Sequence, residues 1–259
     1  MKRIVFLLAV VSLCKTIAFG QKQYEMVIEK SDGSEIVVNV KDVFCVSFRE
    51  RDSSPEGNDT AFTTCPDSNH PHMIDLGLPS GTKWACCNVG ASAPEEYGNY
   101  YAWGETQPKS VYDWGTYEWG SNWYQLTKYI TNSSYGTVDN DTTLDAQDDA
   151  ATANWGAPWR MPSQSQIQEL LSSTTPTRTT QNGVNGQRFT GTNGGTIFLP
   201  AAGGRWDSDL GGAGSYGYYW SSTLYENGPS HAYYLGFYGG HAFWDGNYRD
   251  YGLSVRPVR

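Results

Sequence analysis

The C-terminal end of the chain, from residue 216 onward, most limits the folds that are possible. Three short runs in it have the composition of strands: residues 217–222, 232–237 and 253–258. In the second run, Tyr233 and Leu235 fall on one face and Tyr234 on the other, which is the two-residue period of a β-strand. The intervening segments are rich in Tyr, Asn, His, Trp, Asp and Gly. We therefore predict a scaffold of strands that displays two contact loops, residues 223–231 and 238–251.

The composition favours a β-rich domain over a helical one. The chain has 259 residues, which is enough for one large domain or for a domain with a small appendage. Aromatic residues make up 14% of it, glycine occurs 29 times, and aliphatic residues are sparse. These proportions are typical of short strands and many loops. We expect an α+β fold with few helices and short strands.

One helix is nevertheless well marked, within residues 155–173. Ser163 is in position to cap its N-terminus, and Gln166 follows at the spacing of a capping box. Ile167 and Leu170 are spaced so that they share one helix face. We expect this helix to begin after Ser163 and to pack through that face.

The first 20 residues have the three parts of a secretory signal peptide. Lys2 and Arg3 form its charged start, residues 4–13 form its apolar core, and small residues precede a cleavage point before Gln21. The apolar core is too short to cross a bilayer as a helix, and no second hydrophobic span follows it. The sequence thus predicts an exported protein, secreted or held at the outer cell surface, without a membrane-spanning segment.

The charge of the chain bears on its partners. Cleavage before Gln21 would remove three basic residues and no acidic one, so the net charge would change from −9 to about −12. Nothing in the sequence resembles a basic patch, so nucleic acid is not an expected partner. We expect an extracellular protein or a glycan of unknown identity instead.

The chain divides into further parts after the signal peptide. Residues 21–50 are predicted to form a small β-hairpin module, in which two alternating runs flank a turn at Asp32 and Gly33. Residues 51–72 have the composition of a linker, and residues 73–259 form the main domain. A hairpin this small is marginal alone, so we expect it to dock on a neighbour.

Four cysteines remain after cleavage: Cys45, Cys65, Cys86 and Cys87. Export makes disulfides chemically possible, and a bridge between Cys45 and Cys65 is one option. Buried thiols are the interpretation that we favour.

Two groups of residues have the chemistry of metal ligands. Asp145, Asp148 and Asp149 could bind calcium, although the glycine and glutamate of an EF-hand loop are missing; the same acids also fit the start of a helix. His70 and His72 have an H-x-H spacing, but no third ligand stands near them in the sequence. We therefore interpret the histidines as ordinary loop residues and leave calcium as the one cofactor to consider.

A series of motifs resembles a known family. The pieces DLGLPSGTKWA, NVGA, PEEYGNYYAWGE, DDAATANWG, WRMPS, IFLPAAGGR, GYYWSST and GLSVRPV occur in this order over residues 73–259. Together they resemble the Fibrobacter-type major paralogous domain family of Bacteroidetes exported proteins. The resemblance implies a C-type lectin-like fold, related more distantly to the formylglycine-generating enzymes.

The family resemblance also implies a binding surface. The C-terminal segments resemble the variable regions of diversity-generating retroelements, whose surface positions are rich in Tyr, Asn, Ser, Asp and His. The positions that fit this pattern, and that we predict to bind a ligand, are Tyr225, Asn227, His231, Tyr234, Tyr238, His241, Trp244, Asp245, Asn247, Tyr248 and Asp250.

Two departures from the related families limit the function. Formylglycine-generating enzymes depend on a cysteine pair late in the domain, whereas the last cysteine here is Cys87. Sugar-binding C-type lectins hold calcium with an E-P-N or Q-P-D triplet and a W-N-D strand, and none of these occurs. The resemblance therefore implies the fold without the oxidase activity and without calcium-dependent sugar binding.

Three classes of function are compatible with these patterns. The leading hypothesis is a non-catalytic ligand-binding module, because Tyr and Trp offer broad contact area with few rotatable bonds. An enzyme would use His231 or His241 with Asp245 as acid and base and Ser221 or Ser222 as nucleophile, but no motif brings these residues together. A structural subunit of a surface adhesin or fibre would use the N-terminal module as a docking strand.

Overall fold

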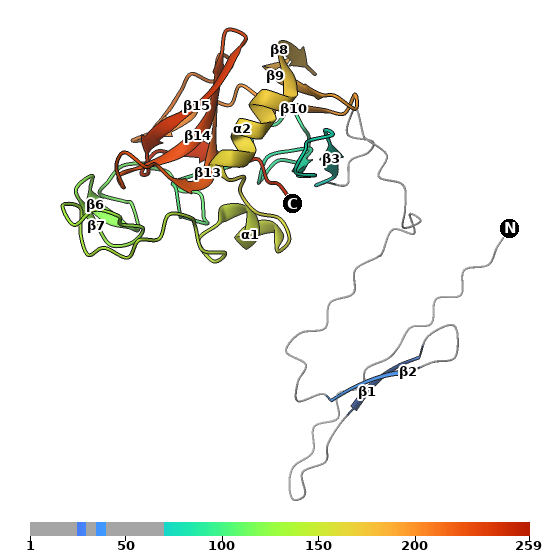
Figure 1. Ribbon diagram of the computed structural model, residues 1–259, viewed down its shortest axis with the longest axis horizontal. Helices are drawn as coiled ribbons and strands as arrows, with labels where there is room; N and C mark the ends of the chain where they lie inside the picture. Colours follow the sequence, from blue (N-terminus) through green and yellow to red (C-terminus); the bar gives the residue numbers. More distant parts are fainter. Residues whose placement is uncertain (1–24, 30–34, 40–69) are drawn as a thin grey trace, which may run out of the picture. The chain divides into compact units, whose positions relative to one another are not determined.

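The computed structural model describes residues 25–29, 35–39 and 70–259, which fall into two units (Figure 1). The first unit contains β1 (Glu25–Glu29) and β2 (Glu35–Asn39), which pair antiparallel where the alternating runs predict a hairpin. The predicted signal peptide, residues 40–50 of the predicted module, the linker up to residue 69, Cys45 and Cys65 lie outside the described residues. No helix among the described residues has the length and apolar character needed to cross a membrane.

The second unit, residues 70–259, consists mostly of β-strands with two short helices, in agreement with an α+β class that has few helices. Its central sheet has the order β15-β14-β13-β16-β5, in which β13 and β16 are parallel and the other neighbours antiparallel. The strands of this sheet are β5 (Tyr100–Tyr101), β13 (Tyr216–Leu224), β14 (His231–Tyr238), β15 (His241–Tyr248) and β16 (Leu253–Ser254).

The other strands of this unit form one three-stranded sheet and three short hairpins. The three-stranded sheet contains β8 (Thr174–Gln181), β9 (Val184–Gly191) and β10 (Thr196–Pro200). The hairpins are β3 (Met73–Asp75) with β4 (Lys83–Ala85), β6 (Gly120–Asn122) with β7 (Gln125–Leu126), and β11 (Gly204–Trp206) with β12 (Asp209–Gly211).

The central sheet is buried on both faces at its middle. Helix α2 (Gln164–Ser173) lies along β13 and β14, and its Ile167 packs in one core cluster with Leu235 and Phe237 (Figure 1). Trp220 and Tyr234 point to the other face, where a second cluster forms. A strand covered on both faces is expected to be apolar throughout, which explains why residues 232–237 of β14 are all buried.

The predicted helix is confirmed with its capping box. The Ser163 side chain accepts the backbone N–H of Gln166, and the Gln166 side chain accepts the backbone N–H of Ser163 in return. A second helix, α1 (Ala150–Trp155), precedes it and ends at Gly156, whose φ of 77° lies in the region that glycine favours.

Two hairpins form from polar segments. Residues 174–195 are mostly polar, yet β8 and β9 form a hairpin there that turns at Asn182 and Gly183, both at positive φ. The predicted contact loop 238–251 is mostly strand β15, which turns back from β14 at Gly239 and Gly240, again at positive φ. Asn-Gly and Gly-Gly are dipeptides that favour two-residue hairpin turns, and this turn preference outweighs the polarity of the flanking residues.

A buried arginine fixes the base of the β14–β15 hairpin. Arg249 is fully buried just after β15, and its guanidinium donates to the carbonyl oxygens of Pro229, Tyr129 and Lys128 and to the hydroxyl of Tyr117. These bonds connect the segments on both sides of the hairpin. The hairpin is therefore anchored to the body of the domain by a side chain that the sequence pattern marked as part of a loop.

Candidate ligand-binding surface

The register of the β14–β15 hairpin separates the predicted site residues onto two faces. Residues directly opposite each other in an antiparallel pair point to the same side. Leu235 pairs with Trp244 on the side where α2 packs, which we call the helix face. Tyr238 pairs with His241 on the opposite side, which we call the far face. The residues that we predicted to form one binding surface therefore lie on two opposite faces of the hairpin.

The helix face contains an open hollow of about 550 Å³. It is lined by Thr131, Thr142, Gln164, Gln168, Thr223, Leu224, Tyr225, Glu226, Tyr233 and Trp244. This volume is within the range of small-molecule sites, which combine aromatic walls with a few polar groups. The hollow fits that description, because two amides, a carboxylate and several hydroxyls surround three aromatic rings.

The aromatic walls of the hollow hold one another in place. Trp244 is 40% exposed, and its ring meets the buried Tyr233 ring edge to face at 5.5 Å between centroids. Tyr225 packs against Tyr233 at 4.8 Å and also lies over Gly246, where a Cβ atom would come within 2.6 Å of its ring. Such edge-to-face contacts restrict ring motion and leave the outer edge of Trp244 available for a ligand.

The remaining predicted residues of this face lie beside the hollow. His231 and Tyr248 pair across the strands with ring centroids 4.2 Å apart, and Ser230 Oγ lies 2.9 Å from His231 Nδ1. Burial lowers the pKa of His231, against a smaller opposing influence of Asp245. His231 is thus a neutral, packed ring at neutral pH, whereas Asn227 in the neighbouring loop is exposed.

The far face has an aromatic patch near the hairpin turn. Tyr216 stacks on Tyr218 at 5.9 Å and contacts Tyr238 at 5.5 Å, and Tyr238 is 49% exposed. His241 and Asp245 are exposed on the same face, and Asn247 is half-buried there. The Phe243 ring lies over Gly236, where a Cβ would approach it to 2.6 Å. Of these residues, Tyr238 also lines a small crevice at the hairpin turn.

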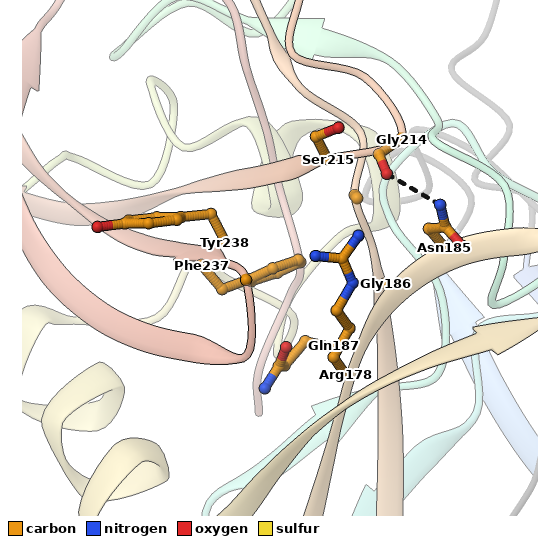
Figure 2. Close-up of a pocket in the computed structure, with 10 residues that line it drawn as sticks. Arg178, Asn185, Gly186, Gln187, Gly214, Ser215, Phe237 and Tyr238 are labelled. Atoms are coloured by element: carbon orange, nitrogen blue, oxygen red, sulfur yellow. Dashed lines mark hydrogen bonds between the residues drawn. The ribbon is translucent and has the colours of Figure 1, made fainter.

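The turn of the hairpin rests on β9. Figure 2 shows this junction, in which the Asn185 side chain donates to the Gly214 carbonyl at 3.1 Å and Arg178 points toward the same crevice. Gln187 Nε2 lies 3.5 Å from the Gly240 carbonyl oxygen at the turn itself. The crevice has a free volume of about 10 Å³, which is room for one water at most. This junction supports the hairpin and is too small to bind a ligand.

The structure buries two of the predicted site residues, Tyr234 and Asp250. Tyr234 is 8% exposed, and it packs between Tyr218 and Phe243 on the covered part of the far face. Asp250 is 3% exposed and sits after the end of β15. Burial raises the pKa of Asp250 to about 7, and its Oδ1 has no hydrogen-bond partner among the described residues. Tyr234 and Asp250 both stand in a polar, aromatic segment of the sequence. Their burial is seen only in the structure.

The three acids considered for calcium have other partners. Asp145 and Asp148 each place a carboxylate oxygen 2.6 Å from Lys128 Nζ. Asp149 caps α1 by accepting the backbone N–H groups of residues 151 and 152, and it also accepts the N–H of Met161. Asp145 and Asp148 thus converge on a lysine ammonium, and Asp149 is engaged by the helix start, so the structure favours the helix-start interpretation over calcium.

The residues considered for catalysis are also separated. His231 lies on the helix face and His241 on the far face. Ser221 and Ser222 are buried and lie against backbone carbonyls of Thr223 and Pro162. No nucleophile, base and acid from this set share one pocket.

About half of the residues that line the hollow were not identified from the sequence. Gln164 and Gln168 come from α2, and Tyr233 of β14 was not among the predicted site residues. Gln164 lies within the predicted capping box and Gln168 lies four residues later on the same helix face, so the pattern indicated their shared orientation but not their partner. Their approach to Trp244 depends on the packing of α2 against the sheet, which one sequence does not reveal.

The fold and this surface define a β-rich domain with an open hollow beside an edge hairpin. Residues 173–258 match the model of a family described as a domain of unknown function, DUF8237. This stretch is thus similar to that family from the end of α2 through β16, and it includes the whole β14–β15 hairpin. No curated protein and no solved structure matches the chain.

Proposed function

We propose that this protein is a non-catalytic ligand-binding protein, exported or held at the outer cell surface, with a C-type lectin-like main domain. The proposal for the fold rests on the motifs over residues 73–259 that resemble the major paralogous domain family. The proposal for export rests on the signal-peptide pattern of the first 20 residues.

The observation that carries the binding function is the hollow on the helix face. Its aromatic walls are fixed by ring contacts, and Glu226, Gln164 and Gln168 supply hydrogen-bonding groups around them. A preformed hollow with immobile walls loses little conformational entropy when a ligand enters. The ligand class that suits it is an extracellular glycan or a segment of an extracellular protein.

The far face supports the same function as a second contact area. Tyr216 and Tyr238 are exposed there beside His241 and Asp245. Exposed tyrosines with adaptable polar neighbours are typical of protein-binding surfaces. The hollow offers about 550 Å³ of space for a ligand, so we assign the main ligand contact to it.

A blocking substitution tests this assignment. The full chain is first screened against an immobilised oligosaccharide array and a random-peptide display library, and the strongest hit serves as the probe. Gln168→Trp places a large ring in the hollow and is expected to weaken binding of that probe at least tenfold. Ser172→Trp adds the same ring to α2 outside the hollow and should leave binding unchanged. Equal effects of the two variants would refute the hollow as the site.

A further inference from the structure

The β3–β4 hairpin brings three potential metal ligands together. Met73 pairs with Ala85, so the next residues outward, His72 and Cys86, also lie opposite each other. The Cys86 backbone N–H donates to the His72 carbonyl at 2.9 Å, which extends the ladder by one step. His70 is two residues before His72, and its ring approaches the same sulfur.

The side-chain atoms converge within the distances of a coordination sphere. Cys86 Sγ lies 2.9 Å from His70 Nδ1 and 3.7 Å from His72 Nδ1, and all three ligand atoms lie within 4.8 Å of one another. The two imidazole rings stand at 75° with centroids 5.1 Å apart. Among the residues that the structure describes, this is the one such group of three.

We propose that His70, His72 and Cys86 bind a zinc-type divalent ion. In a tetrahedral zinc site, bond lengths of about 2.3 Å to sulfur and 2.0 Å to nitrogen separate the two ligand atoms by about 3.5 Å. The observed separations of 2.9 and 3.7 Å lie on either side of that value, so a small rotation of the His70 ring suffices.

The donor set selects the class of ion. One thiolate and two imidazoles suit zinc and its borderline-soft neighbours, whereas calcium and magnesium require oxygen ligands. The backbone N–H of His72 donates to Cys86 Sγ at 3.1 Å, which stabilises the negative charge of a thiolate. The H-x-H spacing of His70 and His72 showed only two ligands in the sequence, because the third ligand, Cys86, comes from the opposite strand.

The surroundings of the site suit a cation. Cys86 is buried at the edge of a core cluster, and both imidazoles are half-buried, so an ion can reach them from the surface. Glu96 lies near His70, and its carboxylate accepts hydrogen bonds from the backbone N–H and the hydroxyl of Ser92. A nearby carboxylate adds favourable electrostatic potential for a divalent ion.

Cobalt titration tests the site directly. Co²⁺ is added to the full chain, because a thiolate bound to Co²⁺ gives a charge-transfer band and tetrahedral coordination gives intense visible bands. We expect both signals to saturate at one equivalent and Zn²⁺ to displace them. Cys86→Ala should abolish the charge-transfer band, and His70→Ala and His72→Ala should each weaken Co²⁺ binding at least tenfold. His241→Gln removes an exposed histidine elsewhere and should leave the Co²⁺ signals unchanged.

Alkylation gives a second readout that needs no variant. Iodoacetamide is applied to the full chain without reductant, and the modified cysteines are identified by mass spectrometry. We expect bound Zn²⁺ to slow the modification of Cys86 and a chelator to restore it. The proposal is overturned if Co²⁺ gives no thiolate band, if His241→Gln weakens binding as much as His70→Ala, or if Cys86 is unreactive with and without zinc. Since the hollow lies on other elements, this test is independent of the ligand-binding proposal.

Discussion

The ring of Trp244 rests edge to face on the ring of Tyr233, with 5.5 Å between their centroids. The two residues are diagonal neighbours across β14 and β15, because Tyr233 pairs with Gly246 and Trp244 pairs with Leu235. Tyr233 is 5% exposed and Trp244 is 40% exposed. The buried ring of Tyr233 thus supports the exposed ring of Trp244, and the sheet holds the exposed ring in a fixed position at the surface.

Gly246→Ala should alter the hollow without unfolding the domain. The added Cβ would come within 2.6 Å of the Tyr225 ring, so that ring must leave its present place on the wall. Tyr225 is half-buried and can move toward solvent, so we expect a Tm loss of only a few degrees. Binding of the probe selected in the screen should fall about tenfold in isothermal titration calorimetry.

Gly228→Ala is the matched control for this substitution. A Cβ there would meet only the Tyr135 hydroxyl, at 3.6 Å, and the residue is not at positive φ. Binding and Tm should both stay at the wild-type values. Wild-type affinity in the Gly246→Ala variant would show that the position of Tyr225 is irrelevant to the ligand.

Arg249→Lys should strongly destabilise the domain. A lysine ammonium does not reach the four oxygen acceptors that the guanidinium satisfies, so buried carbonyls lose their donors. We expect the free energy of unfolding, measured by urea denaturation, to fall by about 3 kcal/mol. Arg178→Lys makes the same change at an exposed site and should cost less than about 0.5 kcal/mol. A loss below about 1 kcal/mol for Arg249→Lys would contradict the anchoring role.

Asp250 should make the stability depend on pH. Burial raises its pKa from 3.8 to about 7, so the folded state holds this proton over a range where the unfolded chain releases it. The corresponding stability is fully present below pH 3.8 and is lost as the pH rises to about 7. One pKa unit corresponds to about 1.4 kcal/mol, so the loss is about 4 kcal/mol at most.

Asp250→Asn removes this titration. Thermal unfolding followed between pH 4 and pH 8 should show a smaller fall in Tm for the variant than for the wild type, and the variant should be the more stable of the two at pH 8. Parallel Tm curves for the two proteins would mean that the carboxyl of Asp250 is not protonated in the folded state near neutral pH.

The sequence predicted the elements whose signals are local. The capping box at Ser163 and Gln166 gave the start of α2, and the alternation around Tyr233 and Leu235 gave β14. The polar strand β15 was missed, because an edge strand has room for Asp, Asn and Gly and its alternation is therefore weak. The Gly239-Gly240 turn before β15 was the sequence feature that indicated a hairpin.

The candidate sites depended on partners far apart in the sequence. Tyr234 and Asp250 have the composition of surface residues, and only the packing of the second core cluster buries Tyr234. Cys86 reaches His72 only through the register of β3 and β4, which spans 14 residues of chain. Gln168 reaches the hollow only when α2 packs on the sheet. Contacts of this kind are set by tertiary structure, and local patterns do not specify them.

The most direct measurement of the central claim is the affinity of Trp244→Ala for the selected probe, compared with that of Trp123→Ala. Both rings are exposed large aromatic groups, but Trp123 lies between β6 and β7, outside the hollow. We predict that Trp244→Ala weakens binding at least tenfold while Tm stays within a few degrees of the wild type, and that Trp123→Ala binds normally. Wild-type affinity for Trp244→Ala, or an equal loss in both variants, would contradict the hollow as the ligand-binding site.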